Sequence, residues 1–125
     1  MHNGSHRTVA VVDDDDAVRD SLQFLLEAAG FPVVTFGSAA QFLGEARIGD
    51  LSCLLVDQHM PDQTGLQLVT SLRRQGTNLP IALITGSPSP DLLRRAGELG
   101  VARVMEKPLD DEALLRFIEC PAAAS

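Results

Sequence analysis

The stretch TVAVVDDDDAVRDSL (residues 8–22) places an apolar run that ends at Val12 directly before four consecutive aspartates, Asp13 to Asp16. The run predicts a buried strand. Carboxylates crowded at the end of such a strand repel one another. Two unit charges about 4 Å apart cost about 4 kcal/mol at an effective dielectric near 20. Either their pKa values rise or a cation relieves the repulsion, so these residues indicate a functional site at the end of the strand.

Short apolar runs of this kind alternate with amphipathic segments along the whole chain. Three of the five runs are nearly unbroken, which is typical of strands covered on both faces. The expected strands are TVAVV (8–12), PVVTF (32–36), LSCLLVD (51–57), PIALIT (80–85) and VARVM (101–105). Five strands alternating with five helices predict an α/β fold with a parallel sheet and right-handed crossovers. We expect a flavodoxin-like three-layer sandwich with strand order 2-1-3-4-5.

Helical spacing of apolar residues and capping residues predict five helices. Gly30 stands where a C′ glycine would end the first helix. Pro88 and Pro90 delay the start of the fourth, because a residue that precedes proline is kept out of the helical region. The helices are expected to start near Asp15 or Asp16, Ser38, Gly65, Asp91 and Asp110.

Length and composition favour one domain with a single well-filled core, since 45% of the 125 residues are hydrophobic. A net charge of −7 argues against direct contact with nucleic acid. No apolar run reaches the ~20 residues of a membrane span, and residues 1–7 lack a signal-peptide core, so we expect a cytoplasmic protein. We interpret Cys53 and Cys120 as reduced, buried thiols. Residues 1–7 are expected to form a disordered leader, and residues 121–125 a tail or the start of a linker.

Polar residues follow the expected strands at their carboxyl ends, where ligands bind in such sheets. Asp13 and Asp14 follow the first strand, Asp57 ends the third, Thr85 ends the fourth and Lys107 follows the fifth. With the strand order 2-1-3-4-5, three carboxylates meet at one edge. Oxygen ligands of this kind suit Mg²⁺. Carboxylates, a divalent ion, a lysine and a hydroxyl together predict a site for a phosphoryl group.

Four motifs carry a family resemblance: VVDDDD, LLVDQHMPDQTGLQL, ALITGS and MEKP, in that order from about residue 8 to residue 119. In this respect the chain resembles a bacterial two-component response-regulator receiver domain of the FixJ-like branch. The resemblance implies that Asp57 accepts a phosphoryl group from a sensor histidine kinase or a histidine phosphotransfer protein. It implies that Asp13, Asp14, Asp57 and the backbone carbonyl of His59 hold Mg²⁺, with Mn²⁺ as the alternative. Lys107 and Thr85 would contact the phosphoryl group.

The resemblance carries further expectations. Residues 8–120 would form the receiver, which catalyses only its own phosphorylation and dephosphorylation and is not otherwise an enzyme. Gly86 would leave room beside Thr85, and His59 and Ser87 would influence the lifetime of the acyl phosphate. The Lys107–Pro108 bond would be cis. Output would involve transcription regulation through an effector domain outside this sequence, or a phosphorylation-dependent homodimer, unless the receiver stands alone.

The sequence departs from the family pattern at the switch position, and several alternative interpretations stay open. The family's aromatic switch residue is Val104 here, and a β-branched side chain has few rotamers to exchange. The chain is therefore either a phosphorylated switch or a degenerate receiver that acts as a phosphate-independent interaction module. Asp13 and Asp15 also have the spacing of an aspartyl phosphatase. Individually, Asp57 could cap a loop, Lys107 could be a surface lysine, and the side chain of His59 could bind a transition metal.

Overall fold

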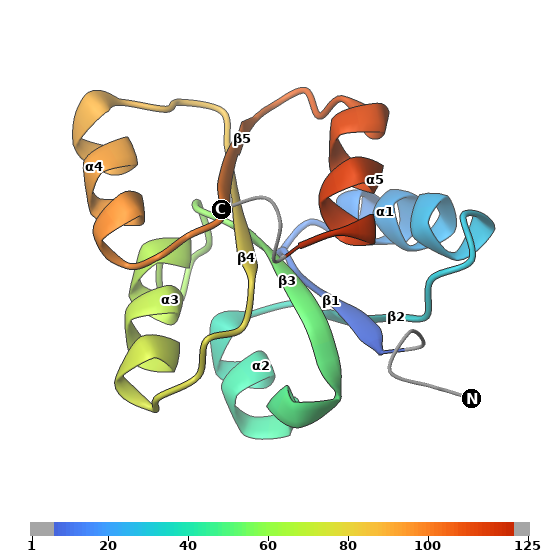
Figure 1. Cartoon of the computed structure of the whole chain (residues 1–125), viewed down its shortest axis with the longest axis horizontal. Helices are drawn as coiled ribbons and strands as arrows, with labels where there is room; N and C mark the ends of the chain where they lie inside the picture. Colours follow the sequence, from blue (N-terminus) through green and yellow to red (C-terminus); the bar gives the residue numbers. More distant parts are fainter. Residues whose placement is uncertain (1–6, 122–125) are drawn as a thin grey trace.

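The computed structural model describes residues 7–121 and contains one five-stranded parallel sheet. The strand order is β2-β1-β3-β4-β5, which confirms the predicted topology (Figure 1). The strands are β1 (Thr8–Val12), β2 (Val33–Phe36), β3 (Leu51–Asp57), β4 (Ile81–Thr85) and β5 (Arg103–Glu106). All five coincide with the expected apolar runs to within two residues at either end.

Helices cover both faces of the sheet. They are α1 (Asp16–Ala28), α2 (Ala39–Glu45), α3 (Gly65–Arg74), α4 (Pro90–Glu98) and α5 (Asp111–Glu119), with a short 3₁₀ turn, η2 (Ile48–Asp50), before β3. One apolar core joins the sheet to α2, α3 and α4, and a second joins it to α1 and α5. Figure 1 shows α1 and α5 together on one side of the sheet. The predicted three-layer sandwich is confirmed.

Capping residues set the helix boundaries where the sequence indicated. Asp15 caps α1, and Ser38 and Asp110 cap α2 and α5 through their side-chain oxygens. Gly30 has φ +96°, the left-handed conformation expected of a C′ glycine. Helix α4 starts at Pro90, one residue before the expected position, because Ser89 is its N-cap and proline is well suited to the first helical turn.

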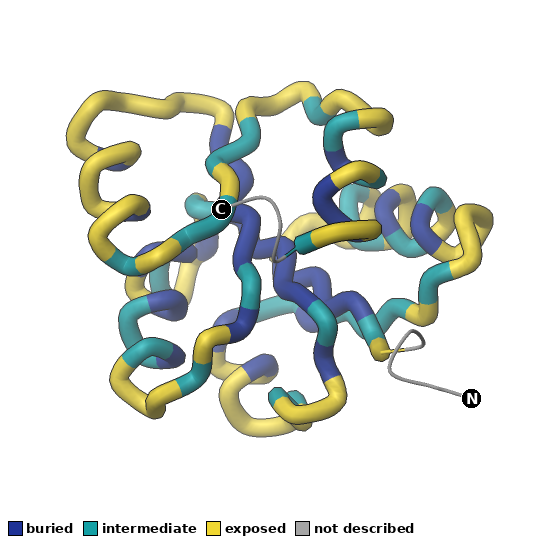
Figure 2. The backbone as a smooth tube through the Cα atoms, viewed as in Figure 1, coloured by how far each residue is buried: buried dark blue, intermediate teal, exposed yellow. Residues whose placement is uncertain are grey.

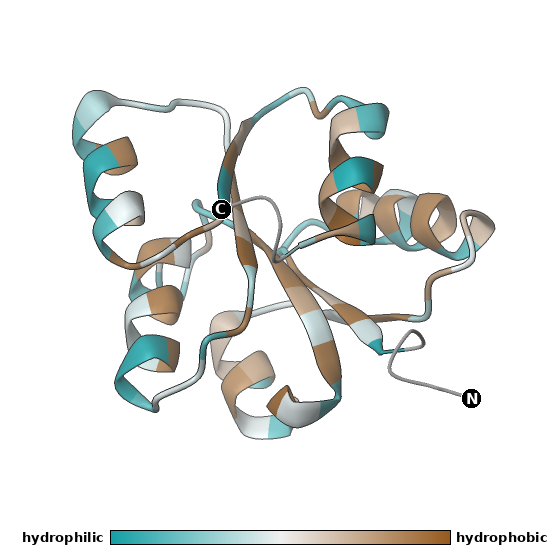
Figure 3. Cartoon of the chain, viewed as in Figure 1, coloured by the Kyte–Doolittle hydropathy of each residue, from teal (hydrophilic) through white to brown (hydrophobic). Residues whose placement is uncertain are grey.

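The central strands are buried on both faces, as their unbroken apolar character predicted. Every residue of β4 and all but one of β3 are buried (Figure 2), and Figure 3 shows these strands as largely hydrophobic. Phe36 and Phe42 meet edge to face, with ring centroids 5.2 Å apart, and fill the space between β2 and α2. This core holds the carboxyl ends of the strands in fixed register.

Some expectations are corrected or lie outside the described residues. Cys53 is buried, but Cys120 is exposed, so its interpretation as a buried thiol is wrong. It follows the last turn of α5, whose buried side consists of Leu114, Phe117 and Ile118. The expected leader and tail lie outside the described residues, except for Arg7 and Pro121. No helix within residues 7–121 is long and apolar enough to cross a membrane.

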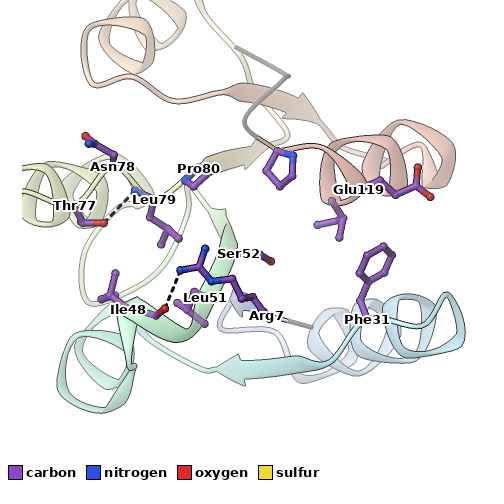
Figure 4. A pocket seen from close by; sticks show the side chains of 13 residues that line it. Arg7, Phe31, Ile48, Leu51, Ser52, Thr77, Asn78, Leu79, Pro80 and Glu119 are labelled. Carbon is purple, nitrogen blue, oxygen red and sulfur yellow. Dashed lines mark hydrogen bonds between the residues drawn. The ribbon is translucent and has the colours of Figure 1, made fainter. Parts of the chain in front are cut away.

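A cavity of about 630 Å³ opens at the amino ends of the strands (Figure 4). Leu51 and Pro80 line it, and Arg7 reaches across to donate a hydrogen bond to the carbonyl of Gly49 at 3.1 Å. None of its lining residues belongs to the predicted acidic edge, which lies at the opposite ends of the same strands.

Candidate functional site

The pairing of β1 with β3 brings the predicted carboxylates together. Val12 lies beside Val56 in the parallel register. The next residues, Asp13 just after β1 and Asp57 at the end of β3, therefore lie at the same edge of the sheet. One carboxylate oxygen from each of Asp13, Asp14 and Asp57 lies within 4.8 Å of the other two. Asp13 and Asp57 are only 2% and 3% exposed, whereas Asp14 is exposed. The site is therefore an acidic group with two buried carboxylates and one that is open to solvent.

Burial raises the pKa of the Asp13 carboxyl above its ordinary value. The hydrogen bond that the backbone N–H of Asp15 donates to Asp13 Oδ1, at 2.9 Å, opposes this rise, and the charge of Asp57 adds to it. The shift shows that negative charge is costly here. A bound cation would offset that cost.

Lys107 supplies positive charge to the buried carboxylate. Its Nζ lies 3.0 Å from Asp57 Oδ1, and its side chain is 40% exposed. No donor among the described residues forms a hydrogen bond of good geometry with this oxygen, so the contact with Lys107 is an ion pair. Partial burial acts to lower the pKa of Lys107, but the contact with Asp57 and the charge of Asp13 outweigh it, and the pKa is raised.

Thr85 is fully buried at the end of β4, beside this ion pair. Its carbonyl accepts a hydrogen bond of 2.9 Å from the backbone N–H of Lys107, which fixes the two residues side by side. Thr85 Oγ1 accepts from the backbone N–H of Ser87 at 3.1 Å, and this leaves the hydroxyl proton available for donation. Gly86 and Ser87 are exposed in the loop that follows.

The loop after β3 holds Asp57 in place through contacts that sequence reasoning missed. Gln58 accepts hydrogen bonds from two successive amides, Gly65 N–H at its carbonyl (3.1 Å) and Leu66 N–H at Oε1 (2.9 Å). Thr64 and Gln67 form a capping box at the start of α3. The spacing Thr-x-x-Gln in the sequence could have revealed this box. These bonds tie α3 to the residue after Asp57.

Asp62, in the same loop, contacts a different helix. Its Oδ2 accepts a hydrogen bond of 2.9 Å from the backbone N–H of Ala40, in the first turn of α2. This bond lowers the pKa of Asp62 below its ordinary value. The loop is thus held to α2 at one end and to α3 at the other.

The remaining predicted residues lie around this edge. The Lys107–Pro108 bond is cis, as expected. Val104 is half-buried on the edge strand β5, where it pairs with Leu83 and packs against the core. The side chain of His59 is exposed, and the one group of potential metal ligands among the described residues is the aspartate trio.

Asp15 does not join the acidic group. Its Oδ1 accepts from the backbone N–H groups of Ala17 and Val18, at 2.9 and 3.2 Å, as the N-cap of α1. This agrees with the expected start of the first helix near Asp15 or Asp16. It also removes the second carboxylate that an aspartyl phosphatase would need beside Asp13.

The donor set of this edge fits a hard divalent cation. All three side chains offer carboxylate oxygens, which suit Mg²⁺ or Mn²⁺ far better than a softer transition metal. Asp57 Oδ1 is a buried oxygen whose polar contact among residues 7–121 is the ion pair with Lys107, and Asp14 keeps the group open to solvent. The arrangement can therefore hold a metal ion beside a carboxylate that faces a lysine.

This fold and site define a receiver domain of two-component signalling. The family model of the response regulator receiver domain matches residues 9–119, and the chain belongs to this family. The resemblance inferred from the four motifs is thereby confirmed.

Relatives place the chain near the FixJ branch. It is 39% identical over 117 residues to the transcriptional regulatory protein FixJ of Azorhizobium caulinodans, and the match covers 94% of this chain and 56% of that protein. The solved structure of FixJ-N superposes with a TM-score of 0.80 at 35% identity, over 95% of this chain and 93% of the other. The response regulator StyR superposes with a TM-score of 0.86 at 38% identity, over 93% of this chain and 59% of that one. The chain spans about half the length of the curated relatives it matches.

Proposed function

We propose that the chain is a phosphorylation-dependent switch in which Asp57 accepts the phosphoryl group. One observation carries the proposal. Asp57 Oδ1 is buried in the acidic group, and its polar contact among the described residues is the ion pair with Lys107 Nζ at 3.0 Å rather than a hydrogen bond from the surrounding protein. A purely structural aspartate at this depth would accept hydrogen bonds from neighbouring backbone or uncharged side-chain groups.

The donor would be a phosphohistidine of a sensor histidine kinase or of a histidine phosphotransfer protein. A carboxylate oxygen of Asp57 attacks the phosphorus, and a new O–P bond forms as the N–P bond breaks. The electron pair of the broken bond stays on the imidazole nitrogen of the donor. The product on this chain is an acyl phosphate.

Asp13, Asp14 and Asp57 would hold Mg²⁺, with the backbone carbonyl of His59 as a further ligand. When bound, the ion neutralises charge on the carboxylates and on the phosphoryl oxygens. Lys107, which already faces Asp57, would follow the phosphoryl oxygens after transfer. Its partial exposure leaves the ammonium room to do so.

Thr85 would couple phosphorylation of Asp57 to a conformational change in the rest of the domain. Its hydroxyl proton is available to a phosphoryl oxygen, and a turn of the side chain would break the bond from Ser87. The loop through Gly86 and Ser87 would then shift the face formed by α4, β5 and α5. Through this face we expect phosphorylation to control a homodimer or, in a longer chain, a transcriptional output like that named for FixJ.

Acetyl phosphate with Mg²⁺, followed by intact mass, tests the proposal. The wild-type chain should gain the mass of one phosphoryl group. Asp57→Asn should show no gain, and the exposed control Asp20→Asn should gain one phosphoryl group as the wild type does. Chelation of the metal should slow the gain at least tenfold, in the range found for lost metal-site contacts. No gain under any condition would favour the degenerate interaction module, for which half-buried Val104 is the best support.

A further inference from the structure

Arg19 makes a contact with the acidic edge that the proposed function does not use. It lies in the first turns of α1, and its side chain is only 20% exposed. Its Nη1 donates a hydrogen bond of 2.6 Å to the backbone carbonyl of Asp13, and its Nη2 pairs with Asp16. A helix-surface ion pair with Asp16 alone would not require the guanidinium to reach back to the strand end.

The carbonyl that Arg19 contacts belongs to the peptide unit between Asp13 and Asp14. Other contacts already fix Asp13, because its N–H donates to the carbonyl of Phe36 at 3.1 Å and its Oδ1 accepts from Asp15. Asp14 is exposed, and within residues 7–121 its carboxylate has no hydrogen-bond partner. The direction of the Asp14 side chain therefore depends on its backbone, and Arg19 holds the peptide unit that precedes it.

The turn after β2 limits where the guanidinium can lie. A Cβ atom at Gly37 would approach Arg19 Nη1 to 3.3 Å and Cζ to 3.7 Å, so glycine leaves space that the guanidinium occupies. Gly37 is held in turn, because its N–H donates to Gln41 Oε1 at 2.8 Å. Arg19 thus lies between the turn after β2 and the strand end of β1.

We propose that Arg19 is a positioning residue for the metal-binding carboxylates, acting through the peptide unit between Asp13 and Asp14. The inference rests on the proposed function of that site. The sign of the change in Mg²⁺ affinity distinguishes positioning from a simple effect of charge. A guanidinium repels a divalent cation, so the loss of its charge alone would strengthen Mg²⁺ binding. Loss of positioning would weaken it.

Calorimetric titration of the metal-free chain with MgCl₂ tests this role. Arg19→Met should weaken Mg²⁺ binding about tenfold, the lower end of the range for residues that orient metal ligands. Arg19→Lys, which can still donate to the carbonyl, should recover most of the affinity. Asp16→Asn removes the ion pair but keeps the bond to Asp13, so it should weaken Mg²⁺ binding much less than Arg19→Met does, by no more than the loss of one exposed, screened charge. Denaturant unfolding without metal separates these effects from general stability.

A second measurement uses phosphorylation by acetyl phosphate at varied Mg²⁺ concentration. The Mg²⁺ concentration at half-maximal rate should rise in Arg19→Met, while the rate at saturating Mg²⁺ stays close to that of the wild type.

Unchanged or tighter Mg²⁺ binding in Arg19→Met overturns the inference and leaves the proposed function intact. If Arg19→Met does not fold, Asp16→Asn decides. A loss of about tenfold in the Mg²⁺ affinity of Asp16→Asn, with wild-type affinity in Arg19→Lys, would assign the effect to the ion pair and overturn the inference. A wild-type chain that binds no Mg²⁺ overturns the proposed function and this inference together.

Discussion

Gly65 packs directly against the backbone of Asp57. A Cβ atom at position 65 would lie 2.8 Å from the Asp57 carbonyl oxygen and 2.6 Å from a methyl group of Leu83. Leu83 could move, but the carbonyl belongs to the strand that carries the candidate phosphoacceptor. The first residue of α3 must therefore lack a side chain if Asp57 is to keep its position.

Gly65→Ala should consequently damage both stability and phosphorylation. We expect a loss of about 1–3 kcal/mol in the free energy of unfolding, the usual cost of overpacking, and a slower gain of phosphoryl from acetyl phosphate. Gly97→Ala is the matched control, because a Cβ there meets nothing within 4 Å and lies inside α4. That change should stabilise by about 0.5–1 kcal/mol. Urea unfolding of the two variants makes the comparison, and equal stability for both would contradict the close packing.

Much of the fold could be predicted because it depends on local patterns. Apolar runs located the strands, and single capping residues such as Ser38 and Gly30 located helix ends. Periodicity was less informative in short helices. Helix α2 has only seven residues and buries chiefly Ala39 and Phe42, so the apolar side chain of Leu43 is 37% exposed.

The candidate site could be predicted only in part. Asp13 and Lys107 each follow a strand and Asp57 ends one, so the strand order alone brings them together. The contacts that support them depend on loop conformation and have no local signature. Arg19 meets a carbonyl that precedes its own helix, and Asp62 meets a helix 22 residues earlier in the chain. Such bonds emerge only when the loops are placed in space.

In Asp13→Asn, the thermal stability of the protein should no longer depend on Mg²⁺. The change removes one charge from three carboxylates that crowd within 4.8 Å, yet an amide oxygen can still accept from Asp15. Two full charges at about that spacing repel by about 3 kcal/mol at an effective dielectric near 20. We expect metal-free Asp13→Asn to unfold at a higher temperature than the wild type, and to lose the further rise in Tm that Mg²⁺ gives the wild type.

Asp15→Asn is the matched control for that experiment. It removes the same charge from a neighbouring residue outside the group, and asparagine is an equally good helix N-cap. Its Tm should still rise with Mg²⁺ as in the wild type. A full Mg²⁺ response in Asp13→Asn would remove Asp13 from the metal site.

The two thiols should differ sharply in reactivity. Burial raises the pKa of Cys53 to about 12, so almost no thiolate is present at pH 8, whereas Cys120 is exposed. Because the thiolate is the reactive species, Ellman's reagent should modify one thiol in the folded protein and two in urea. Cys120→Ser should abolish the fast reaction and Cys53→Ser should leave it unchanged. Rapid modification of both thiols in the native protein would contradict the packing of β3.

Asp62→Ala should destabilise the protein in a pH-dependent way. The bond from Ala40 lowers the pKa of Asp62, so the ionised form stabilises the folded state above its ordinary pKa of about 4. That contribution is lost as the pH falls through the lowered value. Asp62 is exposed and screened by solvent, so we expect only about 0.5–1 kcal/mol at pH 7, the lower part of the range for helix caps. Urea midpoints of wild type and variant should therefore differ at pH 7, and the difference should shrink as the pH falls below about 4. Asp20→Ala, which also removes one exposed negative charge, serves as control for the change in net charge. A difference that persists unchanged to pH 3 would mean that the carboxylate of Asp62 does not hold the loop to α2.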